Sequence, residues 1–192
     1  MEYFRIRQDS RYLHAPVFSN PEEVIQRRKS ISIENADQIQ DVSVLFADGP
    51  HRLDFLDILD KQFFLVSMEV KKVFAMYEPS MIFKNVCILN NEMDEYGQYA
   101  LPLFRELDCV AEGSEISPDR SYIKKLRIRQ MDGLDSIFKV AGLMPDAVII
   151  LLDVPESLLR RGIRRFALER VEIEQKTREY RRGKGDGRNR SR

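Results

Sequence analysis

The chain has very few of the residues that build metal and redox sites. Its 192 residues include no tryptophan, two histidines and two cysteines. A zinc site takes several ligands, and neither His14 nor His51 has a cysteine or carboxylate at ligand spacing. Cys87 and Cys109 form no CxxC pair, so free buried thiols are expected in preference to a disulfide between neighbouring strands. The sequence therefore predicts no metal site and no cofactor.

Long hydrophobic runs and a net charge are also missing. No stretch approaches the ~18 consecutive apolar residues of a membrane span, and the N-terminal MEYFRIRQDS lacks the apolar region of a secretory signal. Basic and acidic residues both number 31, so no overall field draws the chain to nucleic acid or to a membrane. We expect a cytoplasmic protein without a membrane partner.

The charges are distributed unevenly along the chain. Residues 175–192 contain eight basic and two acidic residues, so the rest of the chain carries six more acids than bases. This stretch has no aliphatic residue, and a disordered basic tail is expected there. Positions 1–174 are long enough for one globular domain, with an N-terminal portion (1–50) and a core (56–173).

Residues 63–87 predict a strand, a helix and a second strand. The apolar run 63–66 has strand length, Ser67 stands at a helix N-cap, and Pro79 ends the helix because it has no N–H to donate. An apolar stripe at i, i+3, i+4 and i+7 marks one helix face, and it consists of Val70, Val73, Phe74 and Tyr77. Residues 81–89 then return as a strand.

Residues 147–173 have a similar plan. A shift of about 89 residues lays the first stripe onto a second one and Ile82 onto Val171, as an internal repeat would. The second stripe consists of Leu159, Gly162, Ile163 and Phe166. Two explanations stay open: a weak duplication, or the likeness that any two strand–helix–strand units share.

Much of the remaining chain alternates polar and apolar residues at strand spacing. Residues 2–7 predict a half-buried strand at a sheet edge, and 98–110 predict a long strand in which Pro102 needs an edge or a bulge. A helix is expected from Pro21, with Asn20 as its N-cap. The resulting fold class is α+β, with about three helices packed on a largely antiparallel or mixed β-sheet.

No group of residues indicates catalysis. Ser67 lacks the GxSxG context of a nucleophile, and helix capping accounts for it. The carboxylate pair Asp57 and Asp60 can do acid–base work only in a cleft, and such pairs are common on solvated loops. We therefore expect no catalytic residue and no enzyme.

Four charged stretches remain as candidates for binding. The turn at 90–97 carries Glu92, Asp94 and Glu95, which either bind a basic partner by mimicking phosphates or form a solvated hairpin tip. Strand 121–130 has one mainly basic face, which is either solvated or meets an acidic partner. The basic tail and the arginines of 160–165 offer contacts to nucleic-acid phosphates, although a solubilising terminus is the simpler explanation. The tail residues concerned are Arg178, Arg181, Arg182 and Lys184.

The order of segments over residues 56–173 resembles a bacterial immunity-protein family of polymorphic-toxin loci, formerly a domain of unknown function. The segments are FLVSMEVKKVF, YALPLFRELDCV, YIKKLRI, SIFKVAG and VIILLDVPESLLRRGIRRFALERVEI. The Asp-Cys element of the family corresponds to Asp108 and Cys109. Two features depart from the family pattern: Pro102 interrupts a strand, and the helix at 160–165 is unusually rich in arginine.

The resemblance implies a protein that binds and neutralises a cognate toxin domain, or an orphan interaction scaffold related to such proteins. It carries over no catalytic residue, because the family pattern has none. A nucleic-acid-associated protein that uses the basic tail is the alternative, and the oligomeric state stays open.

Overall fold

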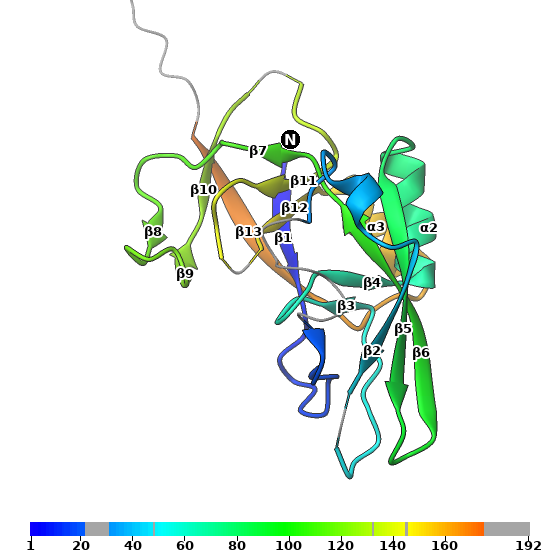
Figure 1. Ribbon diagram of the computed structural model, residues 1–192. Coiled ribbons are helices and arrows are strands. Elements are labelled where there is room, and N and C mark those ends of the chain that lie inside the picture. The colour runs from blue at the N-terminus through cyan, green and yellow to red at the C-terminus, as the bar shows by residue number, and fades with distance from the viewer. Residues whose placement is uncertain (22–30, 48, 132, 145, 175–192) are drawn as a thin grey trace, which may run out of the picture.

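The described part of the chain forms two large mixed β-sheets and one small two-stranded sheet. The computed structural model describes residues 1–21, 31–47, 49–131, 133–144 and 146–174. The six-stranded sheet has the spatial order β10 (Arg127–Arg129), β13 (Ala167–Glu174), β1 (Tyr3–Arg7), β12 (Val148–Leu151), β11 (Ile137–Val140) and β7 (Glu106–Leu107). The five-stranded sheet has the order β2 (Val42–Phe46), β5 (Ile82–Asn90), β6 (Glu95–Leu103), β4 (Leu65–Ser67) and β3 (Ile58–Leu59). The expected α+β class is confirmed, with two mixed sheets in place of one (Figure 1).

Two helices, α2 (Met68–Tyr77) and α3 (Asp153–Arg160), pack against each other in the described part of the chain. Ser67 caps α2 as expected, because its hydroxyl accepts a hydrogen bond from the Val70 N–H at 3.3 Å. The third helix expected from Pro21 falls on residues 22–30, outside the described residues. The smaller elements include the 3-10 helix η2 (Ala36–Gln38) and the hairpin of β8 (Glu115–Ile116) and β9 (Ile123–Lys125).

Helix α3 ends earlier than its apolar stripe predicted. The stripe ran on to Phe166, but Gly162 adopts a left-handed φ of 79° and the Ile163 N–H bonds back to the Leu158 carbonyl at 3.2 Å. This is a glycine-dependent helix ending, which the stripe alone does not reveal. Ile163 and Phe166 still enter the core, from the chain that leaves the helix.

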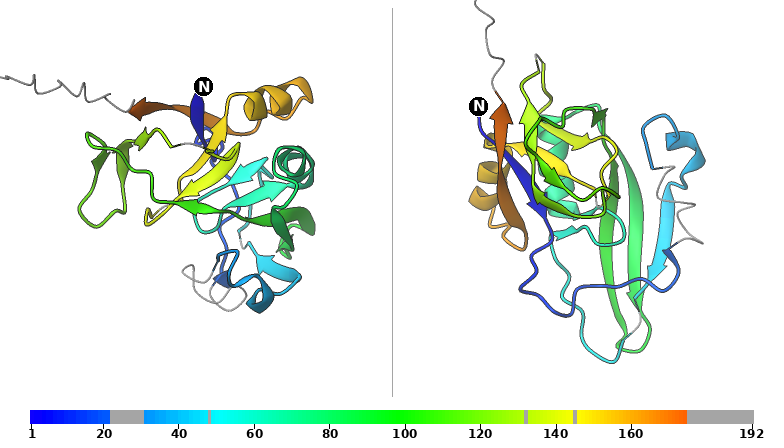
Figure 2. Two further views of the ribbon diagram at one scale, coloured as in Figure 1. Left: turned by 90° about the horizontal axis from the view of Figure 1, so that it is seen from above. Right: turned by 90° about the vertical axis from the view of Figure 1, so that its left-hand side faces the viewer.

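Three apolar clusters form the core, and the helices lie in the middle one. This cluster packs α2 and α3 against one face of each sheet, through Phe74 and Leu158 on the helices and Val66 and Ile150 on the strands. The outer face of the five-stranded sheet is covered by segments around residues 15–18, 36–39 and 53–56. The outer face of the six-stranded sheet is covered by residues from 107–143 (Figure 2).

The two sheets repeat one topology. In each, the strand after the helix (β5 or β13) pairs in parallel with an outer strand (β2 or β10). In the five-stranded sheet, β5 also pairs antiparallel with β6, β6 pairs with β4 before the helix, and β4 pairs antiparallel with β3. In the six-stranded sheet, β13 pairs in the same way with β1, β1 with β12 before the helix, and β12 with β11. The strand–helix–strand repeat, one of the two explanations left open by the sequence, is thus present in the sheet topology.

The repeat also holds in the side-chain register, at an offset of 84 to 85 residues. Val86 and Ile88 of β5 correspond to Val171 and Ile173 of β13, and each pair points into the outer cluster of its sheet. The offset of about 89 was wrong by roughly one helical turn, because an apolar stripe matches itself again after each turn. The corresponding buried helix residues are Val70, Val73 and Phe74 on α2 and Val154, Ser157 and Leu158 on α3.

Strand β1 lies inside the six-stranded sheet, so its predicted place at an edge was wrong. It pairs antiparallel with both β12 and β13, in the position that β6 takes in the other sheet. The misleading residue is Arg5, which reads as a solvent-facing charge but is 2% exposed. Its Nη1 lies 3.5 Å from Oε2 of Glu169, and such a partner is what permits a charge to be buried.

The strand predicted over 98–110 is broken in two. Strand β6 ends at Leu103, and β7 belongs to the other sheet. Pro102 lies opposite Phe83 of β5, whereas the pairing between β6 and β4 covers only Tyr99 and Ala100. Pro102 therefore occupies a local edge of β6, as a residue without an N–H requires.

The basic face of strand 121–130 meets acidic partners within the chain. Lys125 Nζ lies 2.7 Å and Arg127 Nε 3.2 Å from carboxylate oxygens of Glu172 on β13. Arg129 Nη2 lies 3.5 Å from Asp108 Oδ1. These basic residues therefore form the junction with β13.

Asp57 connects the two helical units. Its Oδ2 accepts hydrogen bonds from the backbone N–H groups of Arg164 (3.2 Å) and Arg165 (2.8 Å), in the chain between α3 and β13. Its Oδ1 accepts a hydrogen bond at 3.2 Å from the hydroxyl of Ser67, the cap of α2. Its backbone bonds to Arg165 and Ser67 as well. Asp57 thus links the N-terminus of α2 to the segment that follows α3.

Replacing Asp57 with alanine removes these three side-chain hydrogen bonds and leaves two backbone donors without their acceptor. We expect Asp57→Ala to lower the free energy of unfolding by about 1–3 kcal/mol, measured by urea denaturation. Asp54→Ala is the matched control, because the Asp54 carboxylate accepts one long bond, from the His14 N–H at 3.3 Å. Equal losses in the two variants would contradict a connecting role for Asp57.

Candidate interaction surface

A hydrogen-bonded turn joins β5 and β6 at the end of the five-stranded sheet. The two strands pair along their whole length. Oδ1 of Asn90 accepts hydrogen bonds from the backbone N–H groups of Glu92 (3.1 Å) and Met93 (3.3 Å), and Asp94 adopts a φ of 51°. Asparagine and aspartate suit these positions, since they bond to nearby backbone and tolerate left-handed geometry. The hairpin predicted at 90–97 is confirmed, and its tip projects from the body (Figure 1).

The turn presents two of the three predicted acidic residues to solvent. Glu92 and Asp94 are exposed. Glu95 is half-buried, and its carboxylate accepts a hydrogen bond from the Leu53 N–H at 2.9 Å and lies 3.7 Å from Nε of Arg52. Glu95 therefore holds the neighbouring loop, and Glu92 with Asp94 forms the acidic turn that a partner can reach.

Tyr96 lies beside this turn and escaped the sequence analysis. Its side chain is 70% exposed at the start of β6. Strand alternation contained the signal, because Tyr99 and Leu101 point into the outer cluster and Tyr96 must then point to the opposite face. Tyrosine is one of the residue types that are enriched in protein–protein interfaces.

The arginines of 160–165 are mostly engaged within the chain. Arg160 pairs with Glu156, Arg161 donates to the hydroxyl and carbonyl of Ser157, and Arg165 donates to a backbone carbonyl. The predicted tail residues Arg178, Arg181, Arg182 and Lys184 lie outside the described residues. No described contact therefore joins the arginines into a surface for phosphates.

The residues considered for catalysis have structural roles or stand alone. Ser67 caps α2 and bonds to Asp57. His14 and His51 are exposed, with ring centroids 5.0 Å apart. Among the residues that the structure describes, no three His, Cys, Asp or Glu side chains gather as metal ligands would.

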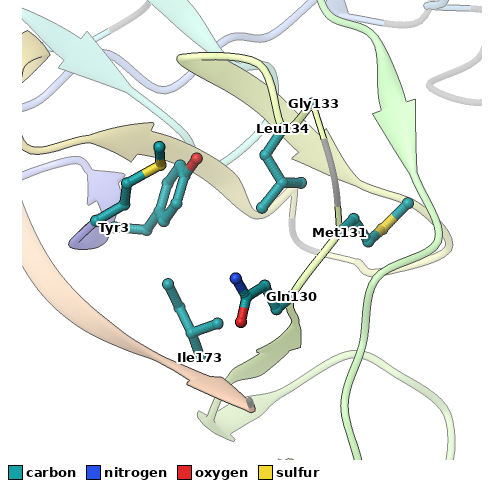
Figure 3. Close-up of a pocket in the computed structure, with 7 residues that line it drawn as sticks. Tyr3, Gln130, Met131, Gly133, Leu134 and Ile173 are labelled. Atoms are coloured by element: carbon teal, nitrogen blue, oxygen red, sulfur yellow. The ribbon is translucent and has the colours of Figure 1, made fainter. Parts of the chain in front are cut away.

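One cavity of about 550 Å³ opens between β1, β13 and the loop after β10. Tyr3, Gln130, Leu134 and Ile173 converge on it (Figure 3). Burial, aided by the negative charge of Asp135, raises the pKa of the Tyr3 phenol, so the phenol stays neutral. The described lining offers one phenol and one amide among apolar walls, and this set contains neither an acid–base pair nor an activated nucleophile.

The two cysteines are free thiols with different environments. Cys109 is fully buried in the outer cluster of the six-stranded sheet, as expected, while its neighbour Asp108 is exposed. Cys87 on β5 is only half-buried, so its expected burial is not complete. Burial raises the pKa of the Cys109 thiol to about 11.

No protein-family model matches the chain, and a search of curated proteins found no match. Within the described residues, no helix has the length and apolar character needed to span a membrane.

The thiol environments predict selective alkylation. At about pH 8, iodoacetamide should modify Cys87 and leave Cys109 intact, because a pKa of about 11 leaves roughly a thousandth of that thiol as the reactive thiolate. Peptide mass spectrometry of the native protein measures this, and both thiols should react in denaturant. Equal labelling of the native protein would contradict the buried position of Cys109.

Proposed function

We propose that the chain is a non-enzymatic immunity protein, which binds a cognate bacterial toxin domain in the cytoplasm and blocks its active surface. The resemblance of residues 56–173 to an immunity-protein family supports this proposal. The described residues add an exposed acidic turn and no constellation that would carry out a reaction.

The acidic turn is the observation that carries the proposal. Glu92 and Asp94 are exposed, and neither carboxylate forms an ion pair with another described residue. Several acids on the strands are paired, such as Glu169 with Arg7 and Glu172 with Lys125. Because Asn90 holds the turn through two backbone hydrogen bonds, the carboxylates are presented on an ordered hairpin without a charge partner of their own.

Two unpaired carboxylates on a projecting hairpin act on a basic partner before contact. At physiological salt their field extends over a Debye length of about 8 Å. The summed charge of a protein surface can raise association rates by roughly 10- to 1000-fold, and these two carboxylates contribute to that sum. The ordered turn also reduces the entropy lost on binding. Charge of this kind contributes mainly to the association rate and to specificity, whereas the lifetime of a complex depends on buried contacts.

Co-expression tests the proposed function directly. The full chain is expressed with the toxin domain encoded beside its gene, followed by growth measurement and co-purification. Restored growth together with a stable complex is the expected result. Persistent toxicity without a complex would overturn the proposal, and salt-dependent nucleic-acid binding that disappears when residues 175–192 are deleted would favour the nucleic-acid alternative.

Neutralising the acidic turn should slow association with that toxin domain. For Glu92→Gln combined with Asp94→Asn, we expect an association rate about tenfold lower at low salt, a weaker salt dependence, and a dissociation rate within about threefold of the original. Surface plasmon resonance at several salt concentrations measures all three quantities.

The matched control for this variant is Glu112→Gln combined with Asp153→Asn. It removes one glutamate and one aspartate charge from exposed positions on other elements. The control should leave the association rate unchanged. Equal slowing by both variants would show that net charge matters and the turn does not.

A further inference from the structure

An apolar patch lies on the five-stranded sheet next to the acidic turn. Strand pairing places Val44 beside Cys87, and Phe46 beside Leu89, which in turn faces Tyr96. The exposed fractions of Val42, Val44 and Tyr96 are 60%, 38% and 70%. The other three side chains are half-buried. We call this set the apolar patch: Val42, Val44, Phe46, Cys87, Leu89 and Tyr96.

The apolar patch is on the helix side of the sheet but beyond the reach of α2. Leu45, Val86 and Tyr99 point into the outer cluster, so their neighbours along each strand point the other way. On this side α2 reaches the positions nearer the middle cluster, where Lys71 bonds to Asn85 at 3.4 Å and lies 5.6 Å from the ring centroid of Phe83. Val42 lies beside Asn85, level with the Lys71 contact, and the rest of the patch extends past it toward the turn.

The six-stranded sheet provides an internal control for this surface. When β5 is aligned with β13 at the offset of 85 residues, Cys87 corresponds to Glu172. Val44, which pairs with Cys87, then corresponds to Arg127, which pairs with Glu172. Arg127 Nε lies 3.2 Å from Glu172 Oε2, so this pair is ionic where the other is apolar. The next positions are charged as well, since Phe46 and Leu89 correspond to Arg129 and Glu174, although the ion pair of Arg129 is with Asp108.

The fold therefore does not require apolar side chains at these positions. The same topology accepts charged, ion-paired residues on the equivalent face of the other sheet. A contiguous exposed apolar surface lowers solubility and is typical of interaction sites. An aromatic residue at its border adds the residue type that contributes most to binding energy in interfaces.

We propose that the apolar patch is the contact surface for the toxin domain and that the acidic turn forms its rim. This proposal rests on the proposed function and specifies the partner chemistry: an apolar surface bordered by basic residues. Charge complementarity selects this partner, because Glu92 and Asp94 border the apolar patch without ion pairs in the described part of the chain. A second copy would bring the same acidic rim, with no complementary charge at this border.

The test transfers the ion pair of one sheet to the other. Val44→Arg combined with Cys87→Glu copies Arg127 and Glu172 onto the equivalent strands, so the fold should be retained with a similar melting temperature. Binding of the toxin domain should weaken by at least about thirtyfold, mainly through faster dissociation, since the apolar centre is lost. Surface plasmon resonance on the full chain measures both rates.

The control variant is Met76→Arg combined with Leu159→Glu. It adds the same two charges at exposed apolar positions, 60% and 46% exposed, on the helices. Unchanged binding by this control and weakened binding by the patch variant would support the proposal. Binding by the patch variant as tight as that of the original chain would overturn it and leave the proposed function standing.

A chain that neither protects cells nor binds the toxin domain would overturn the proposed function and this partner assignment together. Sedimentation velocity of the original chain and the patch variant then identifies the occupant. Self-association that Val44→Arg with Cys87→Glu abolishes would assign the apolar patch to a second copy, against the toxin partner.

Discussion

The apolar layer shared by α2 and α3 is the constraint on which the rest of the structure depends. Each helix is short and buries residues on one face, and that face packs on the sheet of its own unit and against the other helix. Helices of this length are marginal alone and gain their stability from packing. Neither unit therefore completes its core without the other. The hydrogen bonds of Asp57 also hold the start of α2 and the segment after α3 together at the edge of this layer.

Local chemistry made the first helical unit predictable, and non-local pairing limited what the sequence revealed elsewhere. Ser67, the stripe from Val70 onward and Pro79 specify α2 through contacts within a few residues. The end of α3 depends on one glycine inside an apolar stripe, and that stripe also led to the wrong repeat offset. The place of β1 was missed because a buried arginine gives it the pattern of an edge strand.

The candidate surface was predictable only in part, for a similar reason. The acidic residues of the turn stand out in the sequence, and the hairpin confirms their place at a tip. Glu95 turned inward because of a backbone N–H supplied by Leu53, far away in the sequence. The apolar patch combines residues from β2, β5 and β6, and a parallel pairing such as that of β2 with β5 cannot be read from adjacent turns.

The position of β1 has a consequence for how the protein is made. Its pairing partners are among the last described residues, with Tyr3 opposite both Leu151 and Val171. During synthesis this strand must therefore wait until residues up to Val171 have left the ribosome, whereas β5 and β6 can pair as soon as both strands have emerged. Contacts of such long sequence separation form slowly, so closing the six-stranded sheet is expected to be the late step of folding.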